Sequence, residues 1–96
     1  MKMTGNTVFI PGATSGIGLE LAIALQAKGN TVVVGGRRTE LLERIRAEHP
    51  GISAVQIDIS DPASIRTAAQ QVLTEHPDVN VLIAMAGIMR VEDWHP

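Results

Sequence analysis

A glycine-rich turn constrains the fold of this chain more than any other feature. The turn reads Gly12-Ala13-Thr14-Ser15-Gly16-Ile17-Gly18, follows the apolar run Thr7–Ile10 and leads directly into a helical stretch. The first glycine permits a tight turn off a strand, the second lets a backbone approach a bound group without a Cβ in the way, and the third lets helix and strand pack closely. These residues predict a strand–turn–helix unit.

Such a turn suits an anion. The N–H groups and the positive dipole end at a helix N-terminus favour a diphosphate, and the hydroxyls of Thr14 and Ser15 offer further donors. The alternative is a strand–helix turn with no ligand, and the strand–turn–helix context favours the ligand.

Four short apolar runs and three longer amphipathic stretches alternate along the chain. The runs are apolar throughout, as expected for parallel strands covered on both faces. The predicted strands are Thr7–Ile10, Thr31–Val34, Ala54–Ile57 and Val79–Ala84. The predicted helices are Gly16–Lys28 with Gly29 as C-cap, Glu40–Glu48 with Thr39 as N-cap, and a third that has Asp61 as N-cap and Pro62 at its first position and stops before Pro77.

The order β-α-β-α-β-α-β predicts the α/β class, with a Rossmann-type doubly wound parallel sheet. Right-handed crossovers place the strands in the order 3-2-1-4, with the first two helices on one face and the third on the other. We expect one domain, residues 1–96, that forms the N-terminal half of such a sheet and contains no internal repeat.

Composition excludes several functions. The net charge is −2, only 2% of residues are aromatic, and no basic run exceeds Arg37-Arg38, so we expect neither nucleic acid nor membrane as a partner. The chain has no cysteine, and its histidines (His49, His76, His95) have no metal-type spacing, so no metal site is predicted. The first apolar run is too short for a signal peptide, which predicts a cytoplasmic location.

The end of the second predicted strand distinguishes the dinucleotides. NAD sites usually carry an acid there to bond the ribose hydroxyls, whereas this chain reads Val34-Gly35-Gly36-Arg37-Arg38. Two guanidiniums can hold a 2′-phosphate, so the sequence favours NADP. The alternative is a solvated helix start, although positive charge in a first helical turn is mildly unfavourable.

With these residues the chain resembles the N-terminal part of short-chain dehydrogenase/reductases, and within that family it is similar to the DltE-like bacterial oxidoreductases. The resemblance covers all 96 residues. Four segments carry it: Gly12-x-x-x-Gly16-Ile17-Gly18, Gly36-Arg37-Arg38, Asp58-Ile59 and Ala86-Gly87. It implies a parent oxidoreductase that transfers hydride between NADP(H) and a carbonyl or alcohol.

The resemblance also implies roles for single residues. Arg37 and Arg38 would take the adenosine 2′-phosphate, and Asp58 would accept from the adenine amino group with Ile59 packing nearby. Without the resemblance, Asp58 reads as a loop acid ahead of the Asp61 cap. The remaining contacts would be Gly12, Ser15, Gly16, Ile17 and Gly18 at the pyrophosphate and nearby sugar, and Ala86 and Gly87 along the cofactor.

Two positions depart from the family pattern. Pro11 stands where the family usually has Thr, which removes an N–H and a hydroxyl from the turn. Ala84-Met85 replaces the pair Asn-Asn, whose amides normally tie the central strands together. These changes imply weaker cofactor binding or a relaxed constraint, and the sequence leaves both open.

No catalytic residue is predicted. The family uses a Tyr with a lowered pKa, a Lys and a Ser, whereas this chain has no Tyr and its lysines are Lys2 and Lys28. The Tyr-x-x-x-Lys segment would lie beyond Pro96, so the chain alone should be inactive. A non-catalytic NADP(H)-binding module and a degenerate fragment are the alternatives. The fourth strand would be an exposed edge through which the chain self-associates.

Overall fold

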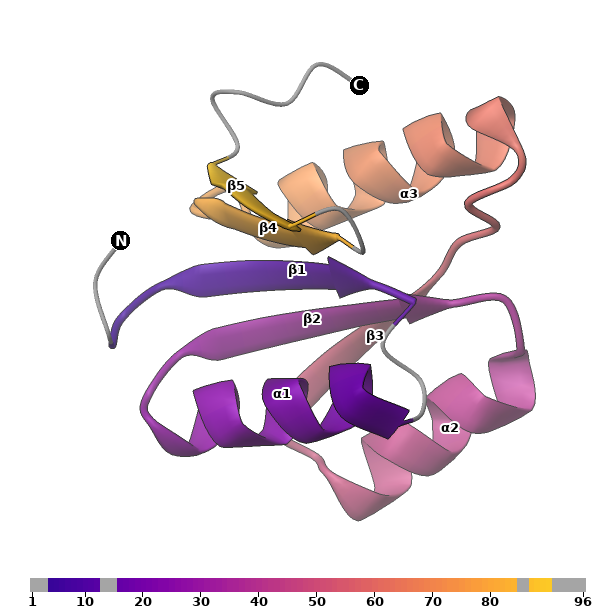
Figure 1. The fold of residues 1–96 in the computed structure, drawn as a ribbon. Helices are drawn as coiled ribbons and strands as arrows, with labels where there is room; N and C mark the ends of the chain where they lie inside the picture. The colour runs from indigo at the N-terminus through magenta and orange to yellow at the C-terminus, as the bar shows by residue number, and fades with distance from the viewer. Residues whose placement is uncertain (1–3, 13–15, 85–86, 91–96) are drawn as a thin grey trace.

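Each β-branched run of the sequence forms a strand of one five-stranded sheet (Figure 1). The computed structural model describes residues 4–12, 16–84 and 87–90. The strands are β1 (Thr7–Pro11), β2 (Thr31–Gly36), β3 (Ile52–Gln56), β4 (Val81–Ala84) and β5 (Gly87–Arg90). The helices are α1 (Gly16–Ala27), α2 (Thr39–Glu48) and α3 (Pro62–Glu75). The sheet order is β3-β2-β1-β4-β5, and the first four strands pair in parallel, so the predicted fold class and the order 3-2-1-4 are confirmed.

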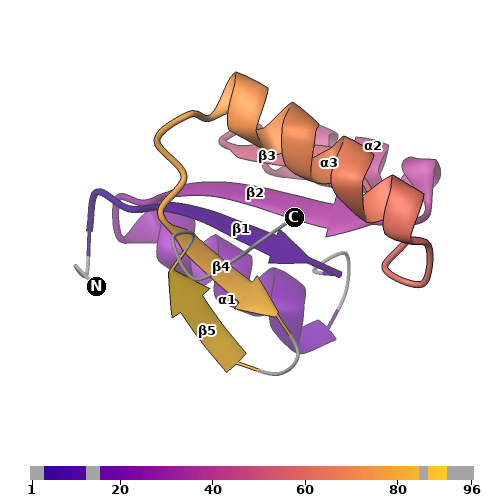
Figure 2. The ribbon, with the colours of Figure 1, turned by 90° about the horizontal axis from the view of Figure 1, so that it is seen from above.

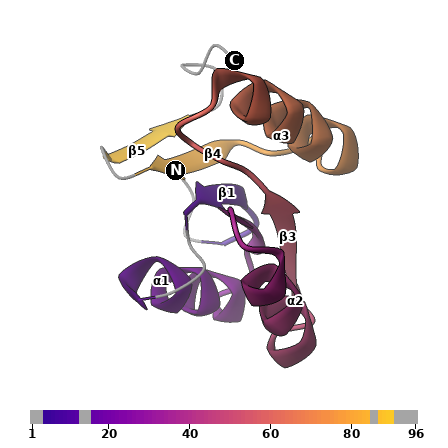
Figure 3. The same cartoon turned by 90° about the vertical axis from the view of Figure 1, so that its right-hand side faces the viewer.

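Alternate residues of the strands point to opposite faces of the sheet and build two cores. Val8, Val32 and Val34 pack with Ala22 of α1 and with Leu42 of α2. Phe9, Val33 and Leu82 pack on the other side with Ala68 and Val72 of α3. Figure 3 shows α1 and α2 below the sheet and α3 above it, as right-handed crossovers predict. The strands are therefore covered on both faces, which explains why they are apolar throughout.

The prediction that the fourth strand forms an exposed edge is wrong. β5 pairs antiparallel with β4 in the register Val81↔Arg90 to Ala84↔Gly87, so β4 lies between β1 and β5 (Figure 2). The N–H and C=O groups of a strand edge need partners, and the segment that follows β4 in sequence is the nearest source. Self-association through an open β4 edge is therefore not supported by this arrangement.

Several predicted boundaries move by one or two residues. β1 and β2 continue to Pro11 and Gly36, beyond the predicted bounds at Ile10 and Val34, because the two strands still pair at Pro11↔Gly35. β3 begins at Ile52 rather than Ala54 and ends at Gln56, and β4 begins at Val81 rather than Val79. α1 ends at Ala27 rather than Lys28.

The helix ends agree with the sequence at two of three predicted caps. Asp61 caps α3 through a hydrogen bond from the N–H of Ala63 to its side chain at 3.0 Å. Gly29 ends α1 with φ +92°, and the N–H of Asn30 donates to the C=O of Leu25 at 3.2 Å, as in a Schellman motif. Thr39 is not a cap, because α2 already begins there and Arg38 occupies the N-cap without a side-chain hydrogen bond.

Polar side chains form hydrogen bonds between the starts of β1, β2 and β4 at the amino edge of the sheet. Asn80 accepts the N–H of Thr7 at 2.8 Å and donates its amide to the side chain of Asn6 at 3.0 Å. The backbone N–H of Asn6 donates to Asn30 at 3.1 Å, and the Thr7 hydroxyl donates to Asp78 at 2.9 Å. The starts of β1, β2 and β4 are thus held in one register, which fixes where their carboxyl ends lie.

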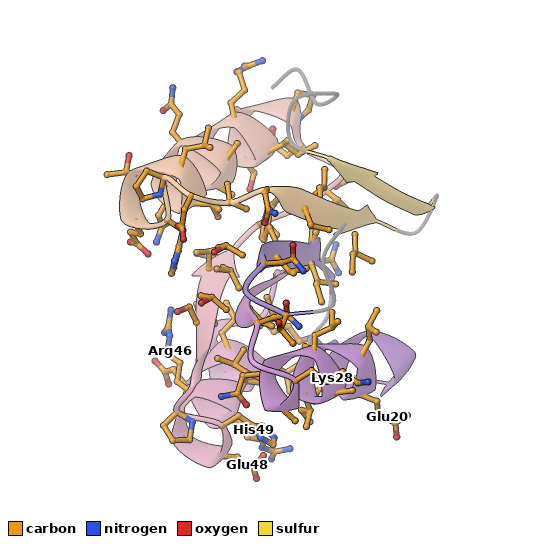
Figure 4. All side chains as sticks on the ribbon, turned by 90° about the vertical axis from the view of Figure 1, so that its left-hand side faces the viewer. Glu20, Lys28, Arg46, Glu48 and His49 are labelled. Atoms are coloured by element: carbon orange, nitrogen blue, oxygen red, sulfur yellow. The ribbon has the colours of Figure 1, made fainter. Side chains whose placement is uncertain are left out.

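The same tripeptide ends α2 and α3, a short repeat that the sequence reading did not recognise. Glu48-His49-Pro50 and Glu75-His76-Pro77 both place His at the C-cap with nearly identical backbone angles. The C=O of each His then accepts the N–H three residues later, at 2.9 Å and 3.0 Å. Figure 4 shows Glu48 and His49 at this end of α2. These histidines turn the chain into the next strand.

Three further properties concern the described residues. Arg46 of α2 donates to the C=O of Ala54 at 2.7 Å and so occupies one outward group of the edge strand β3. None of the helices in the described part of the chain is long and apolar enough to cross a membrane. Within those residues no three His, Asp or Glu side chains gather as metal ligands.

Candidate functional site

A pocket of about 460 Å³ opens at the carboxyl edge of the sheet, beyond the ends of β1, β2 and β3. In open parallel α/β sheets this edge is where ligands bind. The lining comes from three segments that are far apart in sequence: Gly12, then Gly36, Arg37, Arg38 and Leu41, then Ile57, Asp58, Ile59 and Ser60. The structure therefore brings the first glycine of the turn, the arginine pair and the predicted adenine-binding pair into one hollow.

The glycine turn adopts a backbone that other residues rarely accept. Gly12 and Gly16 have φ values of +83° and +62°, and a Cβ built on either would meet no atom within 4 Å. Their need for glycine is thus conformational, and the space beside both is open. The N–H of Gly12 donates to the C=O of Gly35 at 2.6 Å, which ties the turn to β2.

Gly35 brings the three strand ends together, a role that the sequence analysis missed. A Cβ on Gly35 would lie 2.7 Å from Cγ2 of Ile57 and 3.3 Å from both Phe9 Cε1 and Pro11 Cα. Only glycine at position 35 leaves room for these residues of β1 and of the segment after β3 to lie so close to β2. The signal was available, since a glycine inside a strand often marks a close approach of another chain segment.

The arginine pair lies at the junction of β2 and α2. Arg37 and Arg38 both line the pocket and are exposed, and the Gln56 amide donates to the C=O of Arg37 at 3.3 Å. No side chain caps α2, whose N-cap is Arg38. The start of this helix and the two arginines therefore meet at the pocket, an arrangement that favours an anion.

Asp58 is held by two serines. Its carboxylate oxygen Oδ1 accepts the Ser60 hydroxyl at 2.6 Å and the Ser60 N–H at 3.0 Å, while the backbone N–H of Asp58 donates to Oγ of Ser64 at 2.8 Å. The two bonds from Ser60 lower the pKa of Asp58, burial opposes them in part, and the positive charge of Arg37 makes the smallest contribution, also toward a lower pKa. At neutral pH the pocket therefore contains an ionised, acceptor-only carboxylate.

Not every predicted site residue lies in this pocket. Thr14, Ser15 and Ala86 fall outside the described residues. Gly16, Ile17 and Gly18 form the first turn of α1, and Gly87 begins β5, where it pairs with Ala84. The roles of all twelve predicted contacts remain predictions, because the structure shows where residues lie and not what they bind. Ser60 and Ser64 were missed, although a Ser two residues after an Asp is a common turn pattern.

The departure at Pro11 leaves the glycine turn bonded to β2. In a parallel strand successive N–H groups point to opposite neighbours, and the N–H of Gly12 points to β2, so the nitrogen of Pro11 faces β4. The β1–β2 pairing continues through Pro11↔Gly35, while the β1–β4 pairing ends at Phe9↔Leu82. Proline therefore lacks its N–H on the side where β1 and β4 no longer pair.

Comparison with known proteins identifies the family of this chain. The family model described as short chain dehydrogenase matches residues 6–95. The chain belongs to the short-chain dehydrogenase family. This confirms the resemblance stated on the glycine turn and on the three other segments, and the enzymes of this family use nicotinamide cofactors.

Individual relatives agree with the family. The chain is 40% identical over 94 residues to the uncharacterized oxidoreductase DltE of Bacillus subtilis, an alignment that covers 98% of this chain and 37% of that protein. It is 34% identical over 96 residues to retinol dehydrogenase 13 of Mus musculus, covering 94% of this chain and 29% of the relative. This short-chain dehydrogenase thus spans roughly a third of the length of the relatives it matches, as those two shares show.

Solved structures show the same fold. A 3-ketoacyl-(acyl-carrier-protein) reductase from Brucella melitensis, solved with NADH, superposes with a TM-score of 0.76 at 30% identity, over 84% of this chain and 34% of its own. The 2-keto-3-deoxy-D-gluconate dehydrogenase of Streptococcus agalactiae gives a TM-score of 0.78 over 91% of this chain and 34% of its own. At 23% identity the second likeness supports the fold alone.

Proposed function

We propose that this chain is the NADP(H)-binding part of an oxidoreductase that transfers hydride between the cofactor and a carbonyl or alcohol. The observation that carries the proposal is the carboxyl-edge pocket, which joins Gly12, Arg37, Arg38 and Asp58 from three separate segments. Membership of the short-chain dehydrogenase family supports a nicotinamide cofactor at this edge. Arg37 and Arg38 support the choice of NADP, because they can bind the 2′-phosphate that distinguishes NADP from NAD.

The arginine pair supports NADP over NAD. A ribose with free hydroxyls is usually recognised by an acid at the end of the second strand, and an acid there would repel a 2′-phosphate. Here β2 ends in Gly36 and is followed by Arg37 and Arg38, which can donate charge-assisted bonds to a phosphate. The Brucella reductase was solved with NADH, so the fold by itself does not select the phosphate.

Each part of the cofactor has residues suited to hold it. Arg37 and Arg38, with the uncapped start of α2, suit the 2′-phosphate. Asp58 can accept from the adenine amino group, and Ile59, which is 57% exposed, offers an apolar surface to the ring. The glycine turn and the N-terminus of α1 suit the pyrophosphate. The resemblance adds Ser15 at the pyrophosphate and Ala86 and Gly87 along the cofactor.

The chemistry itself needs groups that this sequence lacks. The bound cofactor supplies or accepts the hydride. In the family a Tyr donates the proton, and the 96 residues contain no Tyr, so we propose that the acid comes from residues outside this chain segment. The described residues bind and orient the cofactor, and we assign none of them to catalysis.

Calorimetric titration with NADPH and NADH tests the proposal. We expect saturable binding that prefers NADPH, and we expect Arg37→Ala to lower the NADPH affinity by about tenfold, the size of one hydrogen-bonded charge contact. NADH affinity should change by less than about twofold, because NADH has no 2′-phosphate. Arg44→Ala is the matched control, since Arg44 is an exposed arginine of α2 that does not line the pocket. Equal affinities for the two cofactors would contradict the assignment.

A non-catalytic NADP(H)-binding module is the second candidate. The observation that favours it is that the β1–β4 pairing ends at Phe9↔Leu82, next to Pro11 and Ala84, which stand where the family usually has Thr and Asn. This candidate predicts binding without turnover even when the chain is extended by the segments that follow in its relatives. Turnover of a carbonyl substrate by such an extended protein would exclude it.

A further inference from the structure

The Ser60 side chain lies at the edge of the pocket and holds one oxygen of the Asp58 carboxylate. We propose that Ser60 is a positioning residue, which orients this carboxylate toward the amino group of an adenine base. The inference rests on the proposed function and goes beyond it, because it assigns recognition of the base to a pair of residues rather than to Asp58 alone.

The geometry divides the two carboxylate oxygens between two tasks. The hydroxyl of Ser60 at 2.6 Å and its N–H at 3.0 Å both donate to Oδ1 of Asp58. An ionised carboxylate can accept about four hydrogen bonds over its two oxygens, so Oδ2 is available to a ligand donor. Two donors on one oxygen also fix the rotation of the side chain. The group is therefore ordered before a ligand arrives, which lowers the entropy cost of binding.

The backbone of Asp58 is fixed by a different serine. Ser64 of α3 accepts the N–H of Asp58 at 2.8 Å, so the loop after β3 is anchored to the start of the helix. Ser60 thus controls the side chain and Ser64 the backbone. Removing the Ser60 hydroxyl should leave the loop in place, since the Ser64 contact and the Asp61 cap both remain.

The charges around Asp58 favour an amino group over a carbonyl on the base. The Ser60 bonds and, less strongly, the neighbouring Arg37 lower the pKa of Asp58, and its carboxylate is ionised at neutral pH. An ionised carboxylate accepts hydrogen bonds and donates none. The exocyclic amino group of adenine is a matching donor, whereas a base with an oxygen at that position would present a second acceptor.

Binding of two ligands to three variants tests the role of Ser60. The ligands are NADPH and the NADPH analogue that carries hydrogen in place of the adenine amino group. We expect Ser60→Ala to weaken NADPH by about three- to tenfold, the range for one hydrogen bond to a charged or neutral partner, and to change the analogue by less than about twofold. Ser60→Thr keeps a hydroxyl and should restore NADPH affinity. Thr74→Ala is the control, because it removes an α3 hydroxyl that bonds only the C=O of Gln70 and does not line the pocket.

A second measurement separates this inference from the proposed function. In the free chain, the pKa of Asp58 measured by NMR titration should rise in Ser60→Ala and stay low in Ser60→Thr, with no cofactor present. Equal weakening of both ligands, or no weakening of either, would overturn the positioning role. If the unaltered chain binds no NADPH while the pKa still rises in Ser60→Ala, the hydrogen bonds are real but both the proposed function and the role of Ser60 toward adenine fail.

Discussion

Gly35 provides the sharpest test of how the pocket is built. Replacing its hydrogen by a methyl group places a carbon 2.7 Å from Ile57 Cγ2 and 3.3 Å from Phe9 Cε1 and Pro11 Cα. Ile57 and Phe9 are 4% and 2% exposed and so are packed against the core, and the Pro11 atom belongs to the backbone. Overpacking of this kind costs typically about 1–3 kcal/mol.

We therefore expect Gly35→Ala to lower the free energy of unfolding by about 2 kcal/mol. For a domain of this size such a loss lowers Tm by about 8–16 °C. Denaturant and thermal melts followed by circular dichroism measure both quantities. Gly51→Ala is the matched control: a Cβ there would meet only the amide of the exposed, flexible Gln26, which can move, so we expect a change within about 0.5 kcal/mol of zero.

The partner of the clash can be identified by a double-mutant cycle. Ile57→Ala removes the atom nearest to the new methyl group, so Gly35→Ala should cost less in that background than alone, by about 1 kcal/mol. Gly35→Ala should also weaken NADPH, because Gly12, Arg37 and Asp58 follow the three strands that it separates. Wild-type stability of Gly35→Ala would refute the view that glycine closes the strand ends.

Two further outcomes follow from the polar contacts. Asn80→Ala should destabilise the chain by about 1–3 kcal/mol, because the N–H of Thr7 loses its acceptor in a region where Thr7 is 3% exposed; urea unfolding measures this loss, and an unchanged free energy of unfolding would contradict it. The lowered pKa of Asp58 means that its contribution to stability is present above the unfolded-state pKa and is lost as pH falls through the folded value. Ser60→Ala should weaken this acid dependence, and an unchanged pH profile of unfolding would argue against the Ser60 bonds.

The fold was predictable because its signals are local and agree with one another. The apolar runs predict strands, the glycine turn predicts a strand–helix connection, and Asp61-Pro62 predicts the start of a helix. The order of these elements along the chain leaves few possible topologies. The strand β5 could not be predicted, because Gly87–Arg90 is short and its pairing depends on the neighbouring β4 edge rather than on its own sequence pattern. Thr39 was misread as a cap because a cap is defined by backbone angles that the sequence does not display.

The site was predictable where single residues carry the chemistry. Arg37, Arg38 and Asp58 were recognised from their type and from their place after a strand, and the structure brings all three to the pocket. The contacts that hold these three residues in place were not recognised from the sequence. Gly35 matters because Ile57 and Phe9 lie so close to it, and the hydrogen bond between the side chains of Asn6 and Asn80 joins residues 74 positions apart. Neither contact can be recognised from a short stretch of sequence.

The central claim is that the pocket at the carboxyl edge binds NADP(H). Amide chemical-shift mapping of the isotope-labelled chain during titration with NADPH tests it most directly. The account predicts saturable shifts concentrated at Gly12, at Gly36–Arg38 and at Asp58–Ser60, with little change at the His49 and His76 turns on the opposite edge of the sheet. Shifts confined to other parts of the chain, or no shifts from a folded chain at millimolar NADPH, would contradict it.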